Sequence, residues 1–424
     1  MKDALSRGVQ FIKVDVTDAQ ALTAAFKAPW PTSPSNLSGT RNLEITVFHT
    51  AANIRFYERH VEFLSRSTKV NVIGTENVIN ASREVGATVL VYTSSASVAI
   101  HANKRFLLWP WEATPETFVQ IINDDDNRLP KEHDQFFSNY AVTKIMAERL
   151  VRAANGQTTG HSADKTLKTG AIRPGNGIFG PRGDMLAGAY IVRKNNPSWL
   201  FPFIQSCSYV ENCAAAHLCY EARLIELLSC SSNPDISGQA FCIADPGTTL
   251  TSGDMYTALE TLTDGECHFP SVSPTFMLLL AHCIEWYYRT HNALLSRGWQ
   301  IAKKLPAIGG DLVNLQPSLF SLTSVHVIVD DSRARLPPAK GGLGYTGTWT
   351  TLEGLHRTVE EHKSGLGRSD SRSDSAGVSF KFSFKFGRKK TVGTTVVVPG
   401  PDSLKVADAV QVVSQAPVEV TLPH

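Results

Sequence analysis

Short apolar runs rich in β-branched residues alternate with stretches of helical periodicity through the first half of the sequence. The apolar runs occupy residues 9–14, 43–49, 88–93 and 169–172. Between them, residues 18–27 and 65–84 have the periodicity of helices. Strands that alternate with helices are typical of a parallel sheet whose crossover helices cover both faces. The sequence therefore predicts an α/β fold built on a doubly wound parallel sheet.

The alternation fades after Gly180, where helical pieces are mixed with short strands such as residues 238–244. We expect a sheet domain over residues 1–180, a smaller substrate lobe over 181–362, and a tail over 363–424. The tail begins with a stretch rich in Ser, Gly, Arg and Asp, a composition that predicts disorder. Three inserts in the sheet domain are predicted to be surface loops, at residues 29–42, 100–137 and 155–168.

Charge and cysteine content exclude several classes of protein. The 41 Lys and Arg residues nearly balance the 39 Asp and Glu residues, so the chain has no strong positive electrostatic field that would favour a nucleic-acid partner. The seven cysteines form no Cys-x-x-Cys pair, which predicts no metal site and reduced thiols in a cytoplasmic protein. The amino terminus has no apolar signal segment. The longest apolar stretch, residues 276–288, is shorter than the roughly 20 residues of a spanning helix.

Tyr140 and Lys144 form the most informative pair, at the start of a helical run that continues to Leu150. A spacing of four places the phenol and the ammonium on one helix face. A nearby ammonium favours the phenolate and lowers the pKa of a tyrosine, as proton exchange with an alcohol requires. The same spacing of Tyr and Lys also occurs by chance on helix surfaces. The neighbouring segments must therefore distinguish a catalytic pair from a coincidence.

Ser95 follows the apolar run 89–93 together with the hydroxyls of Thr93 and Ser94. Ligands of doubly wound sheets bind beyond the carboxyl ends of strands. We therefore expect Ser95 to hydrogen-bond the same substrate oxygen that exchanges a proton with Tyr140. The alternative is that these hydroxyls only cap a loop.

Another apolar run ends in Ala51 and Ala52, whose small side chains let a flat ligand approach the backbone closely. The alternative is a plain turn, with His49 as a satisfied core histidine. In the helix that follows, Asn71 is either a polar support or an exposed residue.

Residues 175–180 match the pattern Gly-x-Gly-x-x-Gly after a strand, which ordinarily suggests a pyrophosphate loop. The following Pro181 to Asp184 does not open a convincing helix, so the helix N-terminus that would bind the phosphates is missing. We interpret this segment as a loop beside the nicotinamide half of a cofactor.

Five segments in this order resemble the extended short-chain dehydrogenase/reductases, in particular the 3β-hydroxysteroid dehydrogenase/isomerase group that includes the sterol-4α-carboxylate 3-dehydrogenases. They are Asp15-Val-Thr-Asp18, His49-Thr-Ala-Ala52, Val70-Asn-Val-Ile-Gly-Thr75, Tyr92-Thr-Ser-Ser-Ala-Ser97 and Tyr140 to Lys144. Arg173 to Gly180 and Tyr209 to His217 agree with the resemblance, which covers about residues 1–360. It implies a Rossmann-like sheet and NAD or NADP as cofactor. It also implies an oxidoreductase that interconverts a secondary alcohol, the 3β-hydroxyl of a steroid, sterol or related terpenoid, and its ketone.

Carried over by position, the resemblance implies that Tyr140 is the acid/base, that Lys144 lowers its pKa and holds the nicotinamide ribose, and that Ser95 orients the reacting oxygen. The resemblance also implies contacts with the cofactor. Asp15 and Val16 would border its adenine, Ala51 and Ala52 its middle, and Pro174 its carboxamide. The other implied cofactor-binding residues are Asn71, Thr93, Tyr140 and Lys144.

The sequence departs from this family at its start. Chains of the family open with a strand, a Gly-rich turn, a helix and a second strand, whereas residues 8–18 here already resemble the third strand. We therefore expect either that the true chain starts upstream or that this chain binds the dinucleotide poorly.

The second lobe is apolar and aromatic, which would suit a small apolar alcohol or ketone. Its large residues are Trp199, Phe201, Phe203, Phe276 to Leu280, Trp286 and Tyr287. An ordinary core explains them equally well. Residues 276–288 would lie on a membrane, with a buried helix as the alternative. We expect a cytoplasmic protein peripheral to the endoplasmic reticulum membrane, with a homodimer as a further expectation.

Two other functions stay open. One is a nucleotide-sugar epimerase or flavonoid-type reductase of the same superfamily, which shares the Ser, Tyr and Lys. The other is a catalytically silent, dinucleotide-sensing or scaffold protein, which the missing Gly-rich turn favours.

Overall fold

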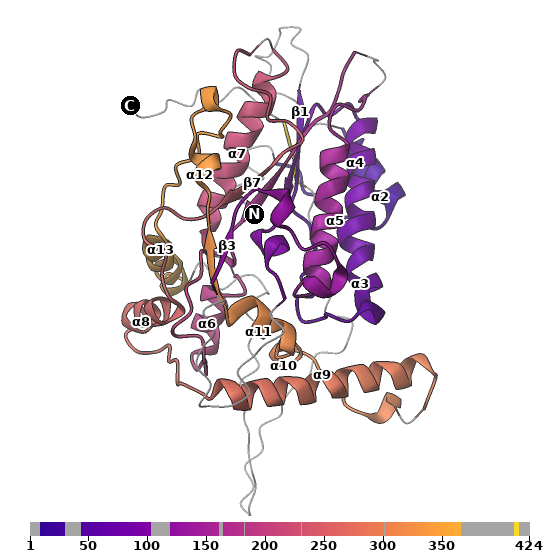
Figure 1. Cartoon of the computed structure of the whole chain (residues 1–424). Coiled ribbons are helices and arrows are strands. Elements are labelled where there is room, and N and C mark those ends of the chain that lie inside the picture. Colours follow the sequence, from indigo (N-terminus) through magenta and orange to yellow (C-terminus); the bar gives the residue numbers. More distant parts are fainter. Residues whose placement is uncertain are drawn as a thin grey trace, which may run out of the picture.

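A central parallel sheet lies between helices in the computed structural model of the chain (Figure 1). The structure describes residues 9–29, 44–102, 119–160, 164–181, 183–229, 231–300, 302–365 and 411–414. Most of the insert at 29–42 and of the tail after 363 therefore lies outside the described residues.

The main sheet has the strand order β7-β4-β2-β1-β9. Its strands are β1 (Ile45–His49), β2 (Val89–Thr93), β4 (Lys168–Pro174), β7 (Ala240–Ile243) and β9 (Gln411–Ser414). The first four are parallel to their neighbours, whereas β9 runs antiparallel to β1. Four of the predicted runs, at 43–49, 88–93, 169–172 and 238–244, are thus confirmed as strands.

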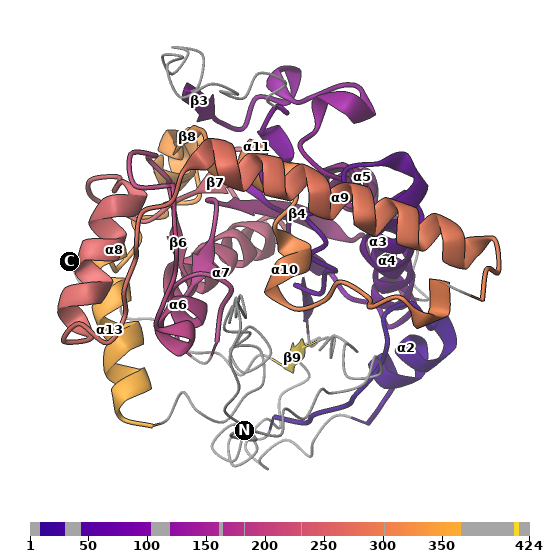
Figure 2. The same cartoon turned by 90° about the horizontal axis from the view of Figure 1, so that it is seen from below.

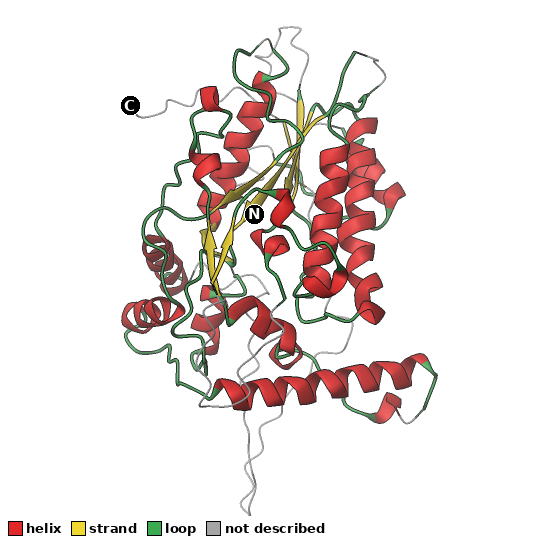
Figure 3. Cartoon of the chain, in the orientation of Figure 1, coloured by secondary structure: helices red, strands yellow, loops and turns green. Residues whose placement is uncertain are grey.

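The sheet is covered on both faces, which confirms the doubly wound α/β fold (Figure 3). Helices α2 (Ala19–Phe26), α4 (Gly74–Glu84) and α5 (Asn139–Ala153) cover one face, and α7 (Val210–Glu226) covers the other. Strand β2 illustrates why the sequence specifies this arrangement. Leu90 and Tyr92 pack under the first group of helices, and Val89 and Val91 pack against α7. Successive side chains of a strand point to opposite faces, so an unbroken apolar run fits a sheet buried on both sides.

The predicted strand at residues 9–14 is wrong. These residues form no strand, and Val9 and Phe11 are 40% and 52% exposed. A strand persists only when a neighbour accepts and donates its backbone hydrogen bonds, and the edge of β1 away from β2 pairs with β9 instead. The helix predicted at 18–27 is confirmed as α2, which Asp18 caps through the backbone N–H groups of Gln20 and Ala21.

The helix predicted at 65–84 forms in three joined pieces. They are α3 (Leu64–Thr68), the π-helical turn η2 (Lys69–Ile73) and α4. A π-turn inserts one extra residue into a helix and often marks a functional site. Here it contains Asn71, whose side chain is 1% exposed.

The insert predicted as a surface loop at 100–137 contains β3 (Val119–Ile122), which pairs in parallel with β8 (His326–Val329). A second short pair joins β5 (Ile178–Phe179) to β6 (Ser208–Tyr209). The remaining longer helices are α6 (Ala187–Arg193), α8 (Ser252–Leu262), α9 (Pro274–Ser296), α11 (Pro317–Thr323) and α13 (Thr351–Lys363). They lie beyond one end of the sheet and beside it, whereas α7 and β7 of the segment 181–362 belong to the sheet itself (Figure 1).

Candidate active site

Helix α5 and the carboxyl end of β2 bring the predicted catalytic residues together. Ser138 caps α5 by accepting a hydrogen bond from the N–H of Ala141, so Tyr140 stands in the first turn of this helix. Ser95 follows β2 by two residues and caps the short helix η3 (Ala96–Ala99) through the N–H of Ser97 at 3.2 Å. The Oγ of Ser95 also hydrogen-bonds the hydroxyl of Ser97 at 2.8 Å, and it is close enough to the phenol of Tyr140 to act against the rise in its pKa. The sequence therefore located a real cluster, and Ser95 is both a loop cap and a neighbour of Tyr140.

Lys144 lies one turn further along α5 and is 2% exposed. Its Nζ donates a hydrogen bond to the carbonyl oxygen of Thr93 at 2.5 Å and lies 4.3 Å from the centre of the Tyr92 ring. Burial lowers the pKa of this ammonium to about 7, although the carboxylate of Glu148 opposes the shift. An ammonium has three N–H donors, so donors remain for further acceptors.

The pKa of Tyr140 moves in the direction opposite to the prediction. Burial raises it to about 12, and the hydrogen bond with Ser95 only partly offsets this effect. The expected lowering by Lys144 is therefore wrong for the chain by itself. The physical reason is that burial removes the phenolate from water, and among the described residues the group that acts against this rise is Ser95 and not Lys144. With a pKa of about 7 and its Nζ bonded to Thr93, Lys144 carries only part of a positive charge near neutral pH.

Asn71 ties the loop after β1 to the helix that carries Tyr140. Its Nδ2 donates to the hydroxyl of Thr143 at 3.0 Å and to the carbonyl of Asn53 at 3.1 Å. Its Oδ1 accepts from the N–H of Asn53 at 2.7 Å. The geometry is that of a buried polar support and not of an exposed helix residue.

The residues implied as cofactor contacts fall into two groups. Ala51, Thr93 and Pro174 lie at or just beyond the carboxyl ends of the adjacent strands β1, β2 and β4, and Ala52 follows Ala51. These residues share one edge of the sheet with the cluster around Tyr140.

Asp15 and Val16 lie elsewhere, at the beginning of α2. Val16 is fully buried against Gly74, where an added Cβ would approach its Cγ2 to 2.8 Å. Asp15 is exposed and accepts a hydrogen bond from the N–H of Thr17 at 2.9 Å. The structure packs Val16 against Gly74 of α4 and leaves Asp15 exposed before α2.

His49 is a buried histidine with one satisfied nitrogen. Its Nε2 lies 2.8 Å from the hydroxyl of Thr75, and Nδ1 has no partner among the residues that the structure describes. Burial, with a smaller contribution from Lys144, lowers its pKa to about 3. His49 is therefore neutral at physiological pH and lies near enough to Lys144 to sense its charge.

The glycine pattern at 175–180 does not open a helix, as predicted. Ile178 and Phe179 form β5, and the next helix, α6, begins only at Ala187. Gly175 is required for packing, since a Cβ there would lie 2.5 Å from the carbonyl oxygen of Ser206.

A dinucleotide fits one end of this site better than the other. Spare N–H donors on buried Lys144 suit the hydroxyls of a ribose, and Ser95 lies beside the phenol of Tyr140. In the part of the chain that the structure describes, no Gly-rich turn leads from a strand into a helix before β1. The nicotinamide half of a dinucleotide therefore fits the residues present.

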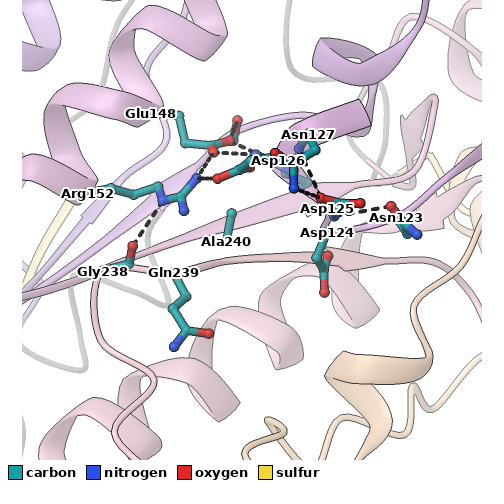
Figure 4. Close-up of polar contacts among 12 residues, drawn as sticks. Asn123, Asp124, Asp125, Asp126, Asn127, Glu148, Arg152, Gly238, Gln239 and Ala240 are labelled. Carbon is teal, nitrogen blue, oxygen red and sulfur yellow. Dashed lines mark hydrogen bonds and ion pairs between the residues drawn. The ribbon is translucent and has the colours of Figure 1, made fainter. Parts of the chain in front are cut away.

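Sequence reasoning missed a buried ionic network behind the site, part of which Figure 4 shows. The carboxylate of Glu148 accepts from the hydroxyl of Ser94 at 2.6 Å and from Arg173 at 2.6 and 2.9 Å. Arg173 and Arg152 also bind Asp126 at 2.8 and 2.6 Å. The side chains of Glu148 and Arg173 are fully buried.

One signal in the sequence pointed to this network. Glu148 follows Lys144 by four residues and so shares its helix face. The network fixes Ser94, next to Ser95, to the same helix that carries Tyr140.

The aromatic residues expected to line an apolar pocket are mostly core or surface. Trp199 stacks on Phe320 at 4.6 Å, and Phe201 packs edge-on against Tyr256. Trp286 is 70% exposed. A cavity of about 380 Å³ lies beside β3 and is lined by His101, Gln120 and Arg128 among others, but not by Tyr140, Ser95 or Lys144.

The low pKa of Lys144 predicts a pH dependence of stability. Between pH 7 and 10.5 the unfolded chain binds a proton at this lysine that the folded chain has lost. The free energy of unfolding therefore rises with pH through this window, by up to ~1.4 kcal/mol per pH unit, and this contribution is lost as the pH falls to 7. In urea unfolding, we therefore expect the free energy of unfolding of the wild type to increase with pH relative to that of Lys144→Met. A difference that does not change with pH would contradict the assignment.

Comparison with known proteins identifies related sequences. A sequence profile of the 3-beta hydroxysteroid dehydrogenase/isomerase family matches residues 2–259. A 3beta-hydroxysteroid-dehydrogenase/decarboxylase isoform 2 from Arabidopsis thaliana is 28% identical over 365 residues, 83% of this chain and 52% of that protein. A decarboxylating sterol-4-alpha-carboxylate 3-dehydrogenase from Schizosaccharomyces pombe is 32% identical over 210 residues, 47% of this chain and 49% of that protein.

The chain thus spans about half the length of these curated relatives. Among solved structures, a UDP-glucose 4-epimerase from Thermotoga maritima aligns with 86% of this chain and 88% of its own, at 17% identity and a TM-score of 0.49.

Proposed function

Because the chain belongs to the 3-beta hydroxysteroid dehydrogenase/isomerase family, we propose that it is an NAD(P)-dependent oxidoreductase acting on the 3β-hydroxyl of a steroid or sterol. The observation that carries the proposal is the cluster of Tyr140, Ser95 and Lys144 at the carboxyl end of β2. The relatives named as 3β-hydroxysteroid and sterol 3-dehydrogenases support this substrate class.

Each residue of the cluster has one task in this proposal. The phenol of Tyr140 exchanges a proton with the substrate oxygen, and the hydroxyl of Ser95 hydrogen-bonds the same oxygen and orients it. Lys144 donates its free N–H groups to the ribose of the dinucleotide. The nicotinamide, when bound, supplies or accepts the hydride. Asn71 and the Glu148 network act as positioning groups, since they hold α5 and the end of β2 in place.

The pKa of Tyr140 favours one direction of proton transfer. A phenol with a pKa of about 12 is protonated at neutral pH, so it is ready to donate a proton to the oxygen of a ketone during reduction. Oxidation of the alcohol needs the phenolate, and a positive charge arriving beside Tyr140 would lower its pKa toward that form.

A catalytically silent protein that senses a dinucleotide or acts as a scaffold is the alternative function. Such a protein would retain the fold and lose turnover.

Binding and turnover separate these two functions. We expect saturable binding of NAD(H) or NADP(H) by calorimetry and dinucleotide-dependent interconversion of a 3β-hydroxysteroid and its 3-ketone. A nucleotide sugar and a flavonoid, assayed in parallel, should not turn over. Dinucleotide binding without turnover of any of the three substrates would favour the silent protein, and turnover of the sugar or the flavonoid alone would replace the steroid.

The proposal also concerns where the protein is located and whether it forms a dimer. No helix of the described chain has the length and apolarity to cross a bilayer. We propose a cytoplasmic enzyme that touches the endoplasmic reticulum membrane from one side, where an apolar alcohol is dissolved. The homodimer stays a prediction.

A further inference from the structure

Thr93, the last residue of β2, is held by side chains from both faces of the sheet. Helix α5 covers one face and α7 covers the other, and Figure 2, seen from below, shows the two helices on either side of β4. From α5, the Nζ of Lys144 donates a hydrogen bond to the carbonyl oxygen of Thr93 at 2.5 Å. From α7, the Nε2 of His217 lies 2.7 Å from the hydroxyl of Thr93. Thr93 therefore links a side chain of α7 to the lysine of the candidate active site.

The second nitrogen of His217 fixes the direction of the hydrogen bond with Thr93. Nδ1 lies 2.7 Å from the backbone carbonyl oxygen of Cys213, one turn earlier in α7. A carbonyl oxygen only accepts hydrogen bonds, so Nδ1 carries the proton of the ring. In a neutral imidazole the other nitrogen is then an acceptor, and Nε2 accepts from the hydroxyl of Thr93. Burial lowers the pKa of His217 despite the hydrogen bond to Cys213, and Lys144 adds to this shift, so the ring is neutral at physiological pH.

The alternation of side chains along β2 explains why α7 reaches Thr93. Val89 and Val91 pack against α7, and Thr93 continues this series on the same face of the sheet. Ser94 points to the other face, where its hydroxyl donates to the carboxylate of Glu148 on α5 at 2.6 Å. Thr93 and Ser94 are thus held by helices on opposite faces of the sheet.

Both ring nitrogens of His217 are engaged within the protein, and the residue is 6% exposed. Neither nitrogen is free to bind a ligand, so any effect of His217 on the site passes through Thr93. A leucine in its place would leave the hydroxyl of Thr93 without this acceptor and free to turn. The peptide group of Thr93 carries the carbonyl oxygen that binds Lys144. Movement at Thr93 would therefore move the ammonium of Lys144.

We propose that His217 is a positioning residue, which fixes the end of β2 through the hydroxyl of Thr93 and so holds Lys144 where its free N–H groups meet the ribose of the dinucleotide. The inference deepens the proposed function and rests on it for the identity of the ligand. His217 lies on the face of the sheet away from the helix that carries Tyr140, and it exchanges no proton with the substrate.

A double-mutant cycle on the full chain without ligand tests the link from His217 to Lys144. His217→Leu, Lys144→Met and the double variant are compared by urea unfolding. We expect the unfolding equilibrium constant of the double variant to be at least about threefold smaller than additivity predicts, because either substitution already breaks the link. Additive losses would overturn the proposal, since the imidazole would then serve the fold alone.

Dinucleotide affinity is the readout that a purely structural histidine would not change. His217→Leu should raise the Kd for NAD(H) or NADP(H) in calorimetry by about tenfold, the equivalent of one hydrogen bond, whereas kcat for a 3β-hydroxysteroid falls by a smaller factor. His217→Gln should restore most of the affinity, because its amide oxygen can accept a hydrogen bond at the place of Nε2. Thr93→Val should match His217→Leu, and the two combined should be no worse than either alone.

His291→Leu is the matched control, because His291 is 8% exposed on α9 and its Nε2 hydrogen-bonds the carbonyl oxygen of Ala302 at 2.9 Å. It should lower stability without changing dinucleotide affinity, and its loss should add to that of Lys144→Met. Thermal unfolding by circular dichroism reports whether each variant folds. Wild-type affinity in His217→Leu, or no recovery in a folded His217→Gln, would overturn the proposal.

The two measurements separate this inference from the proposed function. A wild type that binds no dinucleotide but retains the coupling between His217 and Lys144 would refute the proposed function and leave the positioning of Lys144 intact. A wild type that binds the dinucleotide while the cycle is additive would refute the positioning role alone.

Discussion

Tyr140→Phe should lower kcat for the interconversion of a 3β-hydroxysteroid and its ketone by at least ~100-fold, the lower end of what a positioned acid/base contributes. The substitution removes only the hydroxyl, and the ring keeps its packing at the beginning of α5. Dinucleotide affinity should change little, because Lys144 keeps its hydrogen bond with Thr93 and its free donors. Stopped-flow absorbance of the reduced nicotinamide gives the rate, and calorimetry gives the affinity.

The control for Tyr140→Phe is a buried tyrosine outside the cluster. Tyr345 is 1% exposed and donates its hydroxyl to the carbonyl of Ala244 at 2.9 Å. Tyr345→Phe should cost about 1 kcal/mol of stability, a typical value for one hydrogen bond, and leave kcat unchanged. Equal loss of activity in both variants would mean that the hydroxyls serve the fold, and full activity in Tyr140→Phe would remove Tyr140 from the mechanism.

The sequence carried enough information for the parallel sheet and for the centre of the site. Apolar runs bounded by helices predicted β1, β2, β4 and β7, because a strand buried on both faces is apolar along most of its length. The spacing of Tyr140 and Lys144 predicted a shared face, since helix geometry alone determines it. The family resemblance is confirmed by the profile match over residues 2–259.

The predictions that failed concern features that depend on residues distant in the sequence. Residues 9–14 have the composition of a strand, but no neighbouring strand pairs with them. The pKa of Tyr140 depends on how deeply the phenol is buried, which a spacing of four residues does not reveal. The network of Ser94, Glu148 and Arg173 joins three separate elements, so its members are only recognisable once the fold brings them together.

That network gives the largest expected effect on stability. Burial acts to raise the pKa of Glu148, but the charge and hydrogen bonds of Arg173 overcome this effect and lower it. Arg173→Met would leave the carboxylate of Glu148 in the protein interior with only Ser94 and the more distant Arg152, which lies at 3.2 Å. Removing one partner of a buried ion pair costs about 3–5 kcal/mol. We expect a loss of this size in urea unfolding at neutral pH.

Arg289→Met is the matched control, because Arg289 makes a similar two-bond pair with Glu62 on the surface, where the side chains are 42% and 47% exposed. An exposed pair contributes about 0–1 kcal/mol, since water and salt screen it. Arg173→Met should also recover part of its lost stability as the pH is lowered, because protonation removes the unpaired charge of Glu148. Equal losses in the two variants, or an Arg173→Met protein as stable as the wild type, would mean that the buried pair does not hold α5 against β4.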